Sequence, residues 1–460
     1  MEDYERYQDV LGQLIFLKTY THIVLAFPSQ HDVSQTTIVQ ELERAARLLT
    51  ATFPWLSGHV VREGSSPGVT GLTKIVPYLP GERESIVTVK DCTSLLPSLD
   101  EILAAGGPMA MLDGALLSSR KGLPESYDET VEPAPVLAAQ VSFVKGGMLL
   151  GFAGQHNIMD MNGMAQAIRL FAKALRGEPF TEAEIEQGNR DKRDVIRLLG
   201  PEEQKEDLSS FHVPQKPQAP EGQAPPDLRW VYFHFSGTSL AKLKALVTKV
   251  TETDASMKDL WVSTDDVLSA FISQHILSSR IHRLGKPPNA TATICRAINC
   301  RRFLETSLPR EYMGHMVYCI STPVPLDSPA ATSDLGALAR SLRTALQTLR
   351  PAAIQSFATG LHESPDKGAL SYGATLDFSK YDLMLSSWSG LELFQTDFGK
   401  VLGGRPVLAK RQRFAPMESL MYFMPRTDAG DVDVAACLRV EDIDSLKEDA
   451  EFMQYADYVG

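Results

Sequence analysis

The chain has 460 residues, of which 43% are hydrophobic and 22% charged, an ordinary globular composition with enough length for two domains. Its formal net charge of -12 argues against nonspecific binding to nucleic acid, because such binding needs a basic face that displaces counterions from phosphates. The five cysteines are odd in number and form no Cys-x-x-Cys pair, so they predict neither a disulfide framework nor a zinc ribbon, and we expect no metal site.

Hydropathy along the chain predicts no membrane segment. No apolar run reaches the about 20 residues that a membrane-spanning helix needs. The first residues, Met1 to Arg6, are charged and polar where a signal peptide would have a basic region and an apolar core. We therefore expect a soluble, cytoplasmic monomer with small-molecule partners, and neither a membrane nor a nucleic acid among them.

A composition change near the middle of the chain predicts a linker between two domains. Residues 201–226 are rich in Pro, Glu, Gln and Lys and have little apolar content. A predicted strand, 229–235, and a predicted helix, 239–251, follow this stretch. Further on, Ser263 or Thr264 would cap a helix that carries acidic residues in its first turn.

The most informative stretch lies at the end of a predicted hairpin. Residues 136–144 and 148–153 are apolar, β-prone runs joined by Lys145-Gly146-Gly147, which is typical of a tight turn. Apolar residues then recur at helical spacing through 161–175. His156 therefore leaves a buried strand just before a helix, where a rigid strand could aim its imidazole into a cleft as a general base.

The pattern His156-x-x-x-Asp160 is weak evidence by itself, since the chain contains a second copy. His362-x-x-x-Asp366 fits the same pattern, but it lies in a polar, Pro-containing loop and we expect it on the surface. For His156 alone, a core histidine satisfied by a backbone carbonyl is an equally good interpretation. Sequence context must separate these interpretations.

A second short motif, Asp397-Phe398-Gly399, occurs late in the chain. In a protein kinase, Asp-Phe-Gly accompanies a glycine-rich phosphate loop and a His-Arg-Asp catalytic loop. The chain contains no Gly-x-Gly-x-x-Gly, no Walker loop and no His-Arg-Asp, which excludes the kinase interpretation.

Taken together, His156-x-x-x-Asp160-x-x-Gly163 and the later Asp397-Phe398-Gly399 resemble the BAHD superfamily of acyl-CoA-dependent acyltransferases. Condensation domains and chloramphenicol acetyltransferases carry Gly directly after the Asp, whereas this chain has Met161 there. Within the superfamily the chain looks most similar to the trichothecene 3-O-acetyltransferase group. The stretches that carry this resemblance are Pro54-Trp55, 108–111, 154–160, 263–272, 295–297, 384–388, 418–425 and 458–460.

The resemblance implies an α/β, two-domain, chloramphenicol-acetyltransferase-like fold. Each domain would be a mixed β-sheet flanked by helices, with the active-site channel at the domain interface. Residues 1–205 would form the N-terminal domain, 206–224 the linker and 225–460 the C-terminal domain. A segment near 365–404 would cross back to complete the first sheet.

The resemblance also implies the chemistry. His156 would remove the proton of an alcohol as the oxygen attacks the thioester of acetyl-CoA, a co-substrate, and no tightly bound cofactor would be needed. Asp160 would pair with Arg301 from the second domain, although Asn299 replaces the acid that leads the family's Asp-x-Arg element. Gly163 completes the motif around the histidine.

Other site residues follow from the same comparison. Ser386 would donate to the oxyanion and Trp388 would line the pocket, although both could belong to an ordinary strand. Asp397 and Gly399 would shape the channel, with Lys400 and Val401 replacing the last two residues of the family's Asp-Phe-Gly-Trp-Gly. Two groups of residues are candidates for binding the phosphates of coenzyme A. The first is the helix start at Ser263 and Thr264. The second is the densest basic run, Lys410, Arg411 and Arg413, which could equally be a solvated face.

Three functions remain open from the sequence. The first is O-acetylation of a secondary-metabolite hydroxyl, with a trichothecene-like sesquiterpenoid as the first candidate. The second is acyl transfer to another acceptor, such as an alkaloid alcohol or an amine. The third is a catalytically silent small-molecule binding protein of the same fold.

Overall fold

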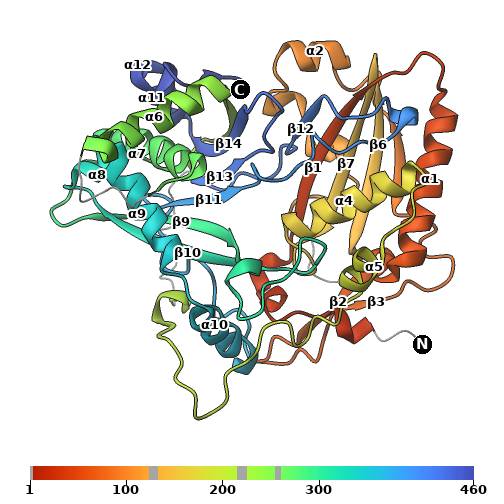
Figure 1. The fold of residues 1–460 in the computed structure, drawn as a ribbon, viewed down its shortest axis with the longest axis horizontal. Coiled ribbons are helices and arrows are strands. Elements are labelled where there is room, and N and C mark those ends of the chain that lie inside the picture. The colour runs from red at the N-terminus through yellow and green to blue at the C-terminus, as the bar shows by residue number, and fades with distance from the viewer. Residues whose placement is uncertain (1–3, 124–132, 215–224, 254–260) are drawn as a thin grey trace.

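The computed structural model describes residues 4–123, 133–214, 225–253 and 261–460. Residues 215–224 of the predicted linker lie outside this part of the chain. The described residues form a five-stranded sheet in the order β12-β1-β7-β6-β4, a seven-stranded sheet in the order β10-β9-β11-β13-β14-β8-β15, and a small sheet β3-β2-β5 (Figure 1). No helix among the described residues is both long and apolar enough to cross a membrane.

The strands are β1 Tyr20–Pro28, β2 His59–Glu63, β3 Leu72–Val76, β4 Val87–Asp91, β5 Ala134–Pro135, β6 Leu137–Val144, β7 Gly147–Gln155, β8 Leu228–Phe235, β9 Thr291–Asn299, β10 Val317–Pro325, β11 Leu383–Ser387, β12 Leu408–Lys410, β13 Leu420–Phe423, β14 Val432–Arg439 and β15 Asp457–Tyr458. The helices are α1 Gln35–Thr52, α2 Leu99–Ala104, α3 Gly114–Leu117, α4 Met161–Leu175, α5 Glu182–Gly188, α6 Gly237–Thr253, α7 Thr264–Leu284, α8 Pro329–Thr332, α9 Leu335–Gln347, α10 Pro351–Glu363, α11 Val440–Glu448 and α12 Ala450–Met453.

The five-stranded sheet is buried on both faces along its central hairpin. Every residue of β6 and β7 is buried, and the two strands pair antiparallel across a turn in which Gly146 has a φ of 82°, a conformation that favours glycine. Helices α1 and α4 pack on one face of this sheet (Figure 1). The predicted hairpin and the helix after it are therefore present, and they carry His156 at the end of β7.

A late segment of the chain returns to the first sheet. Strand β12 pairs antiparallel with β1, with Lys410 opposite Val24. Before it, the buried Phe398 packs on Phe27 at 5.0 Å between ring centroids. Within the range 365–404 that the resemblance implied, β11 belongs to the seven-stranded sheet, whereas Phe398 already packs on the first sheet. The strand that pairs with β1 follows this range at 408–410.

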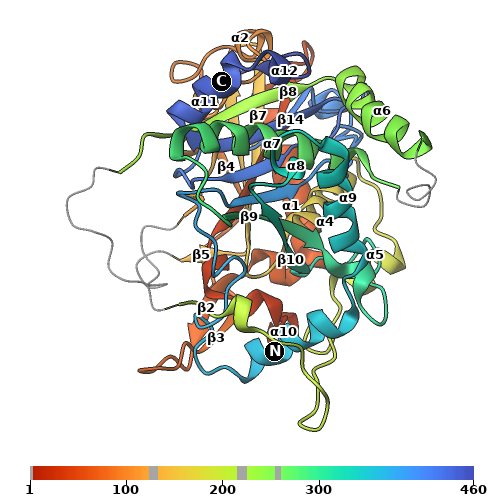
Figure 2. The same ribbon diagram turned by 90° about the vertical axis from the view of Figure 1, so that its left-hand side faces the viewer.

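The seven-stranded sheet has two different faces. Leu383 and Leu385 of β11 belong to the core that this sheet forms with α7 and α9, and Figure 2 shows these helices in front of the strands. Trp388, just after β11, belongs to the core of the first sheet. Because side chains alternate along a strand, Ser386 and Trp388 lie on the face opposite Leu385. That face packs against the first sheet.

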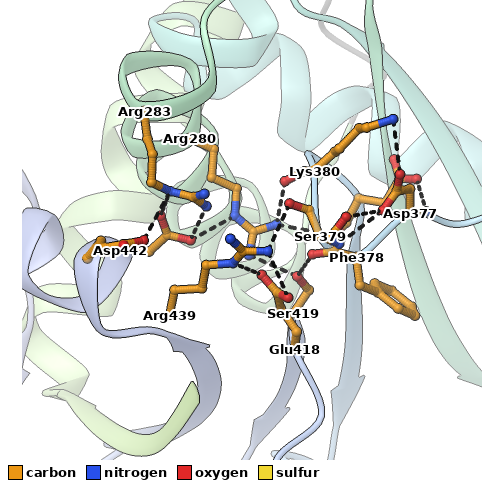
Figure 3. Close-up of polar contacts among 12 residues, drawn as sticks. Arg280, Arg283, Asp377, Phe378, Ser379, Lys380, Glu418, Ser419, Arg439 and Asp442 are labelled. Carbon is orange, nitrogen blue, oxygen red and sulfur yellow. Dashed lines mark hydrogen bonds and ion pairs between the residues drawn. The ribbon is translucent and has the colours of Figure 1, made fainter. Parts of the chain in front are cut away.

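A buried ionic cluster ties α7 and α11 to β13. The guanidinium of Arg280 donates to the carboxylate of Asp442 at 3.0 Å and to the hydroxyl of Ser419 at 2.8 Å, and Arg283 reaches the same carboxylate at 2.9 Å (Figure 3). Asp442 is fully buried, so both guanidiniums are needed to compensate its lost hydration. The cluster lies within the second sheet's unit and fixes the helices that frame it.

Candidate active site

His156 lies in a turn that hydrogen bonds attach to the N-terminal part of the chain. Its backbone N–H donates to the carbonyl of Thr19 at 2.9 Å, next to β1. The side chain of Asn157 donates to the carbonyls of Gly12 at 2.5 Å and Leu14 at 3.1 Å. As a whole residue, His156 is partly exposed.

The tautomer of His156 follows from one hydrogen bond. Its Nδ1 lies 3.2 Å from the carbonyl oxygen of Met159. A carbonyl oxygen can only accept, so Nδ1 carries the proton and Nε2 keeps its lone pair in the neutral ring. Burial lowers the pKa of His156 below its ordinary value, and the charge of Arg411 acts in the same direction, against the opposing effects of Met159 and Asp160. The ring is thus neutral at pH 7, with Nε2 free to accept a proton.

His315 supports His156 from the second sheet. Its Nδ1 lies 2.9 Å from the backbone carbonyl of His156, and the two rings meet edge to face at 5.0 Å between centroids. Its backbone N–H donates to Asp9 at 3.1 Å. Burial, together with the neighbouring His156, lowers the pKa of His315 to about 3. A neutral His315 therefore holds the turn at His156 without adding charge.

Asp160 is the N-cap of α4 and the partner of Arg301. It accepts from the N–H of Gly163 at 2.8 Å, from Arg301 at 2.7 and 3.0 Å, and from the N–H of Met316 at 2.9 Å. Although burial alone would raise it, the pKa of Asp160 is lowered to about 2, chiefly by Arg301. The ion pair that the resemblance implied is present, and it joins the end of β7 to the residues after β9.

The backbone of Met313 approaches α4 so closely at Gly163 that no side chain fits there. A Cβ at this position would lie 2.5 Å from the carbonyl oxygen of Met313, on the segment that leads to His315. A side chain would push that segment away from α4. The glycine thus lets the two halves of the molecule meet beside His156.

A cavity of about 700 Å³ opens next to this ion pair. Asn162 of α4, Ser263 at the start of α7 and Leu385 of β11 are among its walls. Six arginines line it: Arg169, Arg296, Arg301, Arg302, Arg310 and Arg343. Such a wall attracts a polyanionic ligand, because guanidinium groups match phosphate oxygens in geometry and charge.

The arginines of the cavity differ in how they are already engaged. Arg296 and Arg343 both bind Asp266, the former at 2.9 Å, and Arg310 binds Glu392 at 2.5 Å. Arg302 and Arg169 have no carboxylate within 4 Å among the described residues, and Arg302 is exposed. Arg169 donates through Nε to the side chain of Gln166 at 3.0 Å, but neither cation is neutralised by a carboxylate within this part of the chain.

Ser263 lines the cavity, and Thr264 does not. Ser263 caps α7, accepting from the N–H of Asp266 at 3.1 Å and donating to its carboxylate at 2.6 Å. The predicted capping of this helix is present. Of the two residues that the sequence predicted at this helix start as contacts of coenzyme A, only Ser263 faces the cavity.

The three residues of the basic run lie apart from the arginine-rich cavity. Lys410 is buried and pairs with Asp433 at 3.1 Å, and Arg413 pairs with Asp113 at 2.7 Å. Arg411 is buried against aromatic rings, and none of the three lines the arginine-rich cavity. Consecutive residues leave a strand in opposite directions, so a dense basic run does not make a single phosphate site.

Ser386 and Trp388 lie on the face that meets the first sheet. Ser386 is half-buried, opposite Ala297 of β9 and Tyr422 of β13. The ring of Trp388 lies 4.9 Å from that of Tyr422. The cavity-lining Leu385 and Ser387 point to the other face.

Asp397 and Gly399 lie far from His156. Arg176, at the C-terminal end of α4, donates to the carbonyl of Asp397, and the carboxylate of Asp397 accepts from the N–H of Gly399 at 2.7 Å. Helix α4 separates them from the histidine by about 22 Å, from the rise per residue of an α-helix. Gly399 has a φ of 78°, which a non-glycine residue would adopt only with strain. The contact with Arg176 thus attaches the segment before β12 to the C-terminal end of α4.

Sequence reasoning missed His315 and, apart from Arg301, the arginines that line the cavity. Arg296 comes from β9 and Arg343 from α9, so only the fold brings them together. For Arg296, the signal was a charged residue inside an otherwise apolar strand. No comparable signal marks His315, which follows a glycine in a loop.

A neutral histidine between two packed sheets, beside a cavity for a polyanionic ligand, is the arrangement of an acyl-CoA-dependent acyltransferase. The chain belongs to the Transferase family, which it matches over residues 119–453. Residues 19–175 match the trichothecene 3-O-acetyltransferase-like N-terminal domain.

Relatives extend over the whole chain. O-acyltransferase pigD of Monascus ruber is 43% identical over 100% of both chains. Trichothecene 3-O-acetyltransferase TRI101 of Fusarium sporotrichioides is 39% identical over 98% of this chain and 96% of its own. The crystal structure of the latter protein complexed with coenzyme A and T-2 superimposes with a TM-score of 0.88 at 36% identity, covering 98% of this chain and 99% of the other. The two-domain BAHD fold and the acyltransferase class are thus confirmed.

Asp160→Ala should lower both stability and activity. It leaves the buried Arg301 without its carboxylate, which costs about 3–5 kcal/mol. Thermal and urea unfolding measure the loss, and Asp366→Ala, in the exposed second copy of the pattern, is the matched control. An unchanged melting temperature of Asp160→Ala would count against the ion pair as a structural support.

The same variant should also change the acid sensitivity of the protein. A carboxylate whose pKa is lowered to about 2 contributes stability in full above the unfolded value of about 4. That contribution disappears as the pH falls from about 4 toward 2. Unfolding curves of Asp160→Ala should therefore lose part of their pH dependence in this window.

Proposed function

We propose that this enzyme moves an acetyl group from acetyl-CoA to a hydroxyl of a secondary metabolite, with His156 as general base. The observation that carries the proposal is the Nε2 of His156, which is unprotonated because Nδ1 donates to Met159. In this proposal residues 1–205, with the returning segment, form one domain and 225–460 the other, and the reaction takes place where they meet.

The reaction needs a single base. Nε2 accepts the proton of the acceptor hydroxyl as its oxygen attacks the thioester carbonyl carbon, and the carbonyl π electrons move to oxygen. Collapse of the tetrahedral intermediate breaks the carbon–sulfur bond. The departing thiolate, whose conjugate thiol has a pKa of about 8.5, takes the proton back from the imidazolium. The products are an ester and free coenzyme A, and no covalent acyl-enzyme is required.

Ser386 is the proposed donor to the oxyanion. Its half-buried position on the inward face of β11 supports this role, and Trp388 on the same face would line the acyl pocket. A hydroxyl held by a strand loses little entropy when it donates, which suits the stabilisation of a transient charge.

The arginine-rich cavity is the proposed site of the coenzyme A phosphates. Arg302 and Arg169 supply charges that no described carboxylate within 4 Å neutralises, and the start of α7 adds a partial positive charge at Ser263. Arg301 lines the same cavity and binds Asp160, so a donor seated there lies beside the catalytic turn.

The acceptor class is carried over from relatives as a proposal. A trichothecene-like sesquiterpenoid is the first candidate, because a trichothecene 3-O-acetyltransferase is similar over nearly the whole chain. Another acceptor, such as an alkaloid alcohol or an amine, is the second candidate, because the name of O-acyltransferase pigD, at 43% identity, specifies no acceptor. Release of free thiol from acetyl-CoA with a panel of alcohols separates both from a silent binding protein.

His156→Ala should reduce turnover by about 10²–10⁴-fold, the usual contribution of a general base. Thiol release from acetyl-CoA in the presence of an accepted alcohol measures it. His362→Ala, which removes the exposed histidine of the second His-x-x-x-Asp copy, is the control and should keep full activity. Folding of both variants is checked by thermal unfolding. A near-normal rate in His156→Ala would refute the base assignment.

Arg302→Ala should raise the KM for acetyl-CoA by about tenfold or more, the effect of one charge-assisted hydrogen bond to phosphate. With S-acetylpantetheine, a donor without phosphates, the same variant should match the unmodified enzyme. Arg47→Ala, at an exposed arginine of α1, is the control. Equal changes in KM with both donors would place the phosphates elsewhere.

A further inference from the structure

Arg411 is a buried cation without a carboxylate partner. Only 4% of its surface is exposed, and no acidic side chain among the described residues lies within 4 Å of its guanidinium. Its Nε is buried and has no hydrogen-bond partner in this part of the chain. Burial of an unpaired charge is costly, so such a group is rare without a function.

The structure holds this guanidinium in a fixed place. The hydroxyl of Tyr232 donates to the backbone carbonyl of Arg411 at 2.8 Å and accepts from its N–H at 2.9 Å. Three aromatic rings surround the guanidinium, with centroids 4.2 Å away for Phe414, 4.4 Å for Tyr422 and 5.3 Å for Trp388. Cation–π contacts of about 0.5–2 kcal/mol each offset part of the burial cost but satisfy no N–H donor.

Arg411 follows a strand of the first sheet and does not line the arginine-rich cavity, so we assign it to the acceptor side of the proposed reaction. It follows β12, which pairs with β1, and its charge lowers the pKa of both His22 on β1 and His156. Its neighbour Trp388 belongs to the inward face of the second sheet, whereas the cavity assigned to coenzyme A is lined from the opposite face by Leu385 and Ser387. The phosphates of the donor therefore do not neutralise it.

We propose that Arg411 binds an electron-rich oxygen of the acceptor, a carboxylate, an ionised enol or phenol, or a conjugated carbonyl, while the surrounding rings contact its unsaturated part. This inference rests on the proposed function, since it names the substrate class of the same site. The acceptor is thus an oxygen-rich, unsaturated alcohol, and Arg411 fixes which of its hydroxyls reaches His156. The guanidinium offers donors in one plane, which suits a planar oxygen group.

Binding measured by calorimetry tests this assignment without turnover. The probes are the 2-, 3- and 4-hydroxymethylbenzoates, which vary the separation between hydroxyl and carboxylate, each compared with the matching methylbenzyl alcohol. They are titrated into the full-length enzyme saturated with coenzyme A. We expect at least one benzoate to bind about tenfold or more tightly than its methyl counterpart, as one charge-assisted contact provides. Arg411→Met should abolish this preference, and Arg411→Lys should keep part of it.

The matched control is Arg405→Met, which removes an exposed arginine from the same returning segment and should keep the preference. Equal binding of every pair by the unmodified enzyme, or a preference that survives in Arg411→Met, would overturn the proposal. If Arg411→Met fails to fold, the test uses Arg411→Lys, in which a reduced preference is expected and an undiminished one would overturn the proposal. Acetylation of the same probes is measured separately, so a preference in binding without any acetylation would contradict the proposed function and leave the Arg411 assignment standing.

Discussion

The ion pair between Asp160 and Arg301 is the interaction on which the rest of the site depends. It joins two residues 141 positions apart, one at the start of α4 and one after β9. The carboxylate also caps α4 and accepts from Met316, so one buried group fixes the helix start, the turn before it and the loop that carries His315. The position of the His156 ring is therefore set by both halves of the molecule, and Gly163 leaves room for their contact.

This coupling has a consequence for the two substrates. Because Arg301 also lines the arginine-rich cavity, the group that fixes the catalytic turn faces the proposed donor site. On the other face of β11, Trp388 and Arg411 define a second environment that is aromatic and carries an unpaired charge. In the proposed function, the alternating side chains of β11 thus separate the donor side from the acceptor side.

The sequence predicted the parts of this site that are local. A buried hairpin, a histidine at its end and a helix capped by Asp160 follow from patterns within about 40 residues, and the structure contains each of them. The pairing with Arg301 needed a resemblance, because no local pattern relates residues so distant. The predicted crossover near 365–404 contains Phe398, which packs on the first sheet, but not β12, because β11 and β12 are both short and the sequence does not show which sheet each joins.

Charge density along the sequence was the least reliable guide. In the basic run, Lys410 pairs with Asp433, Arg411 packs on aromatic rings and Arg413 pairs with Asp113. The arginines that line the cavity come from α4, β9, α9 and the loop after β9. The side chains of charged residues that are neighbours along a strand point in opposite directions, whereas the charged side chains that meet in the cavity come from separate elements. Only the three-dimensional arrangement distinguishes these cases.

The central claim is that His156 is a neutral imidazole with its proton on Nδ1 and a free Nε2. Nitrogen-15 NMR of histidine-labelled protein, with His156→Ala used to assign the signals, measures both the tautomer and the charge of the ring. The account predicts a protonated Nδ1 and an unprotonated Nε2 at pH 7, with the ring becoming charged only below the ordinary histidine value of about 6.5, because its pKa is lowered. A proton on Nε2, or a charged imidazolium at pH 7, would contradict it.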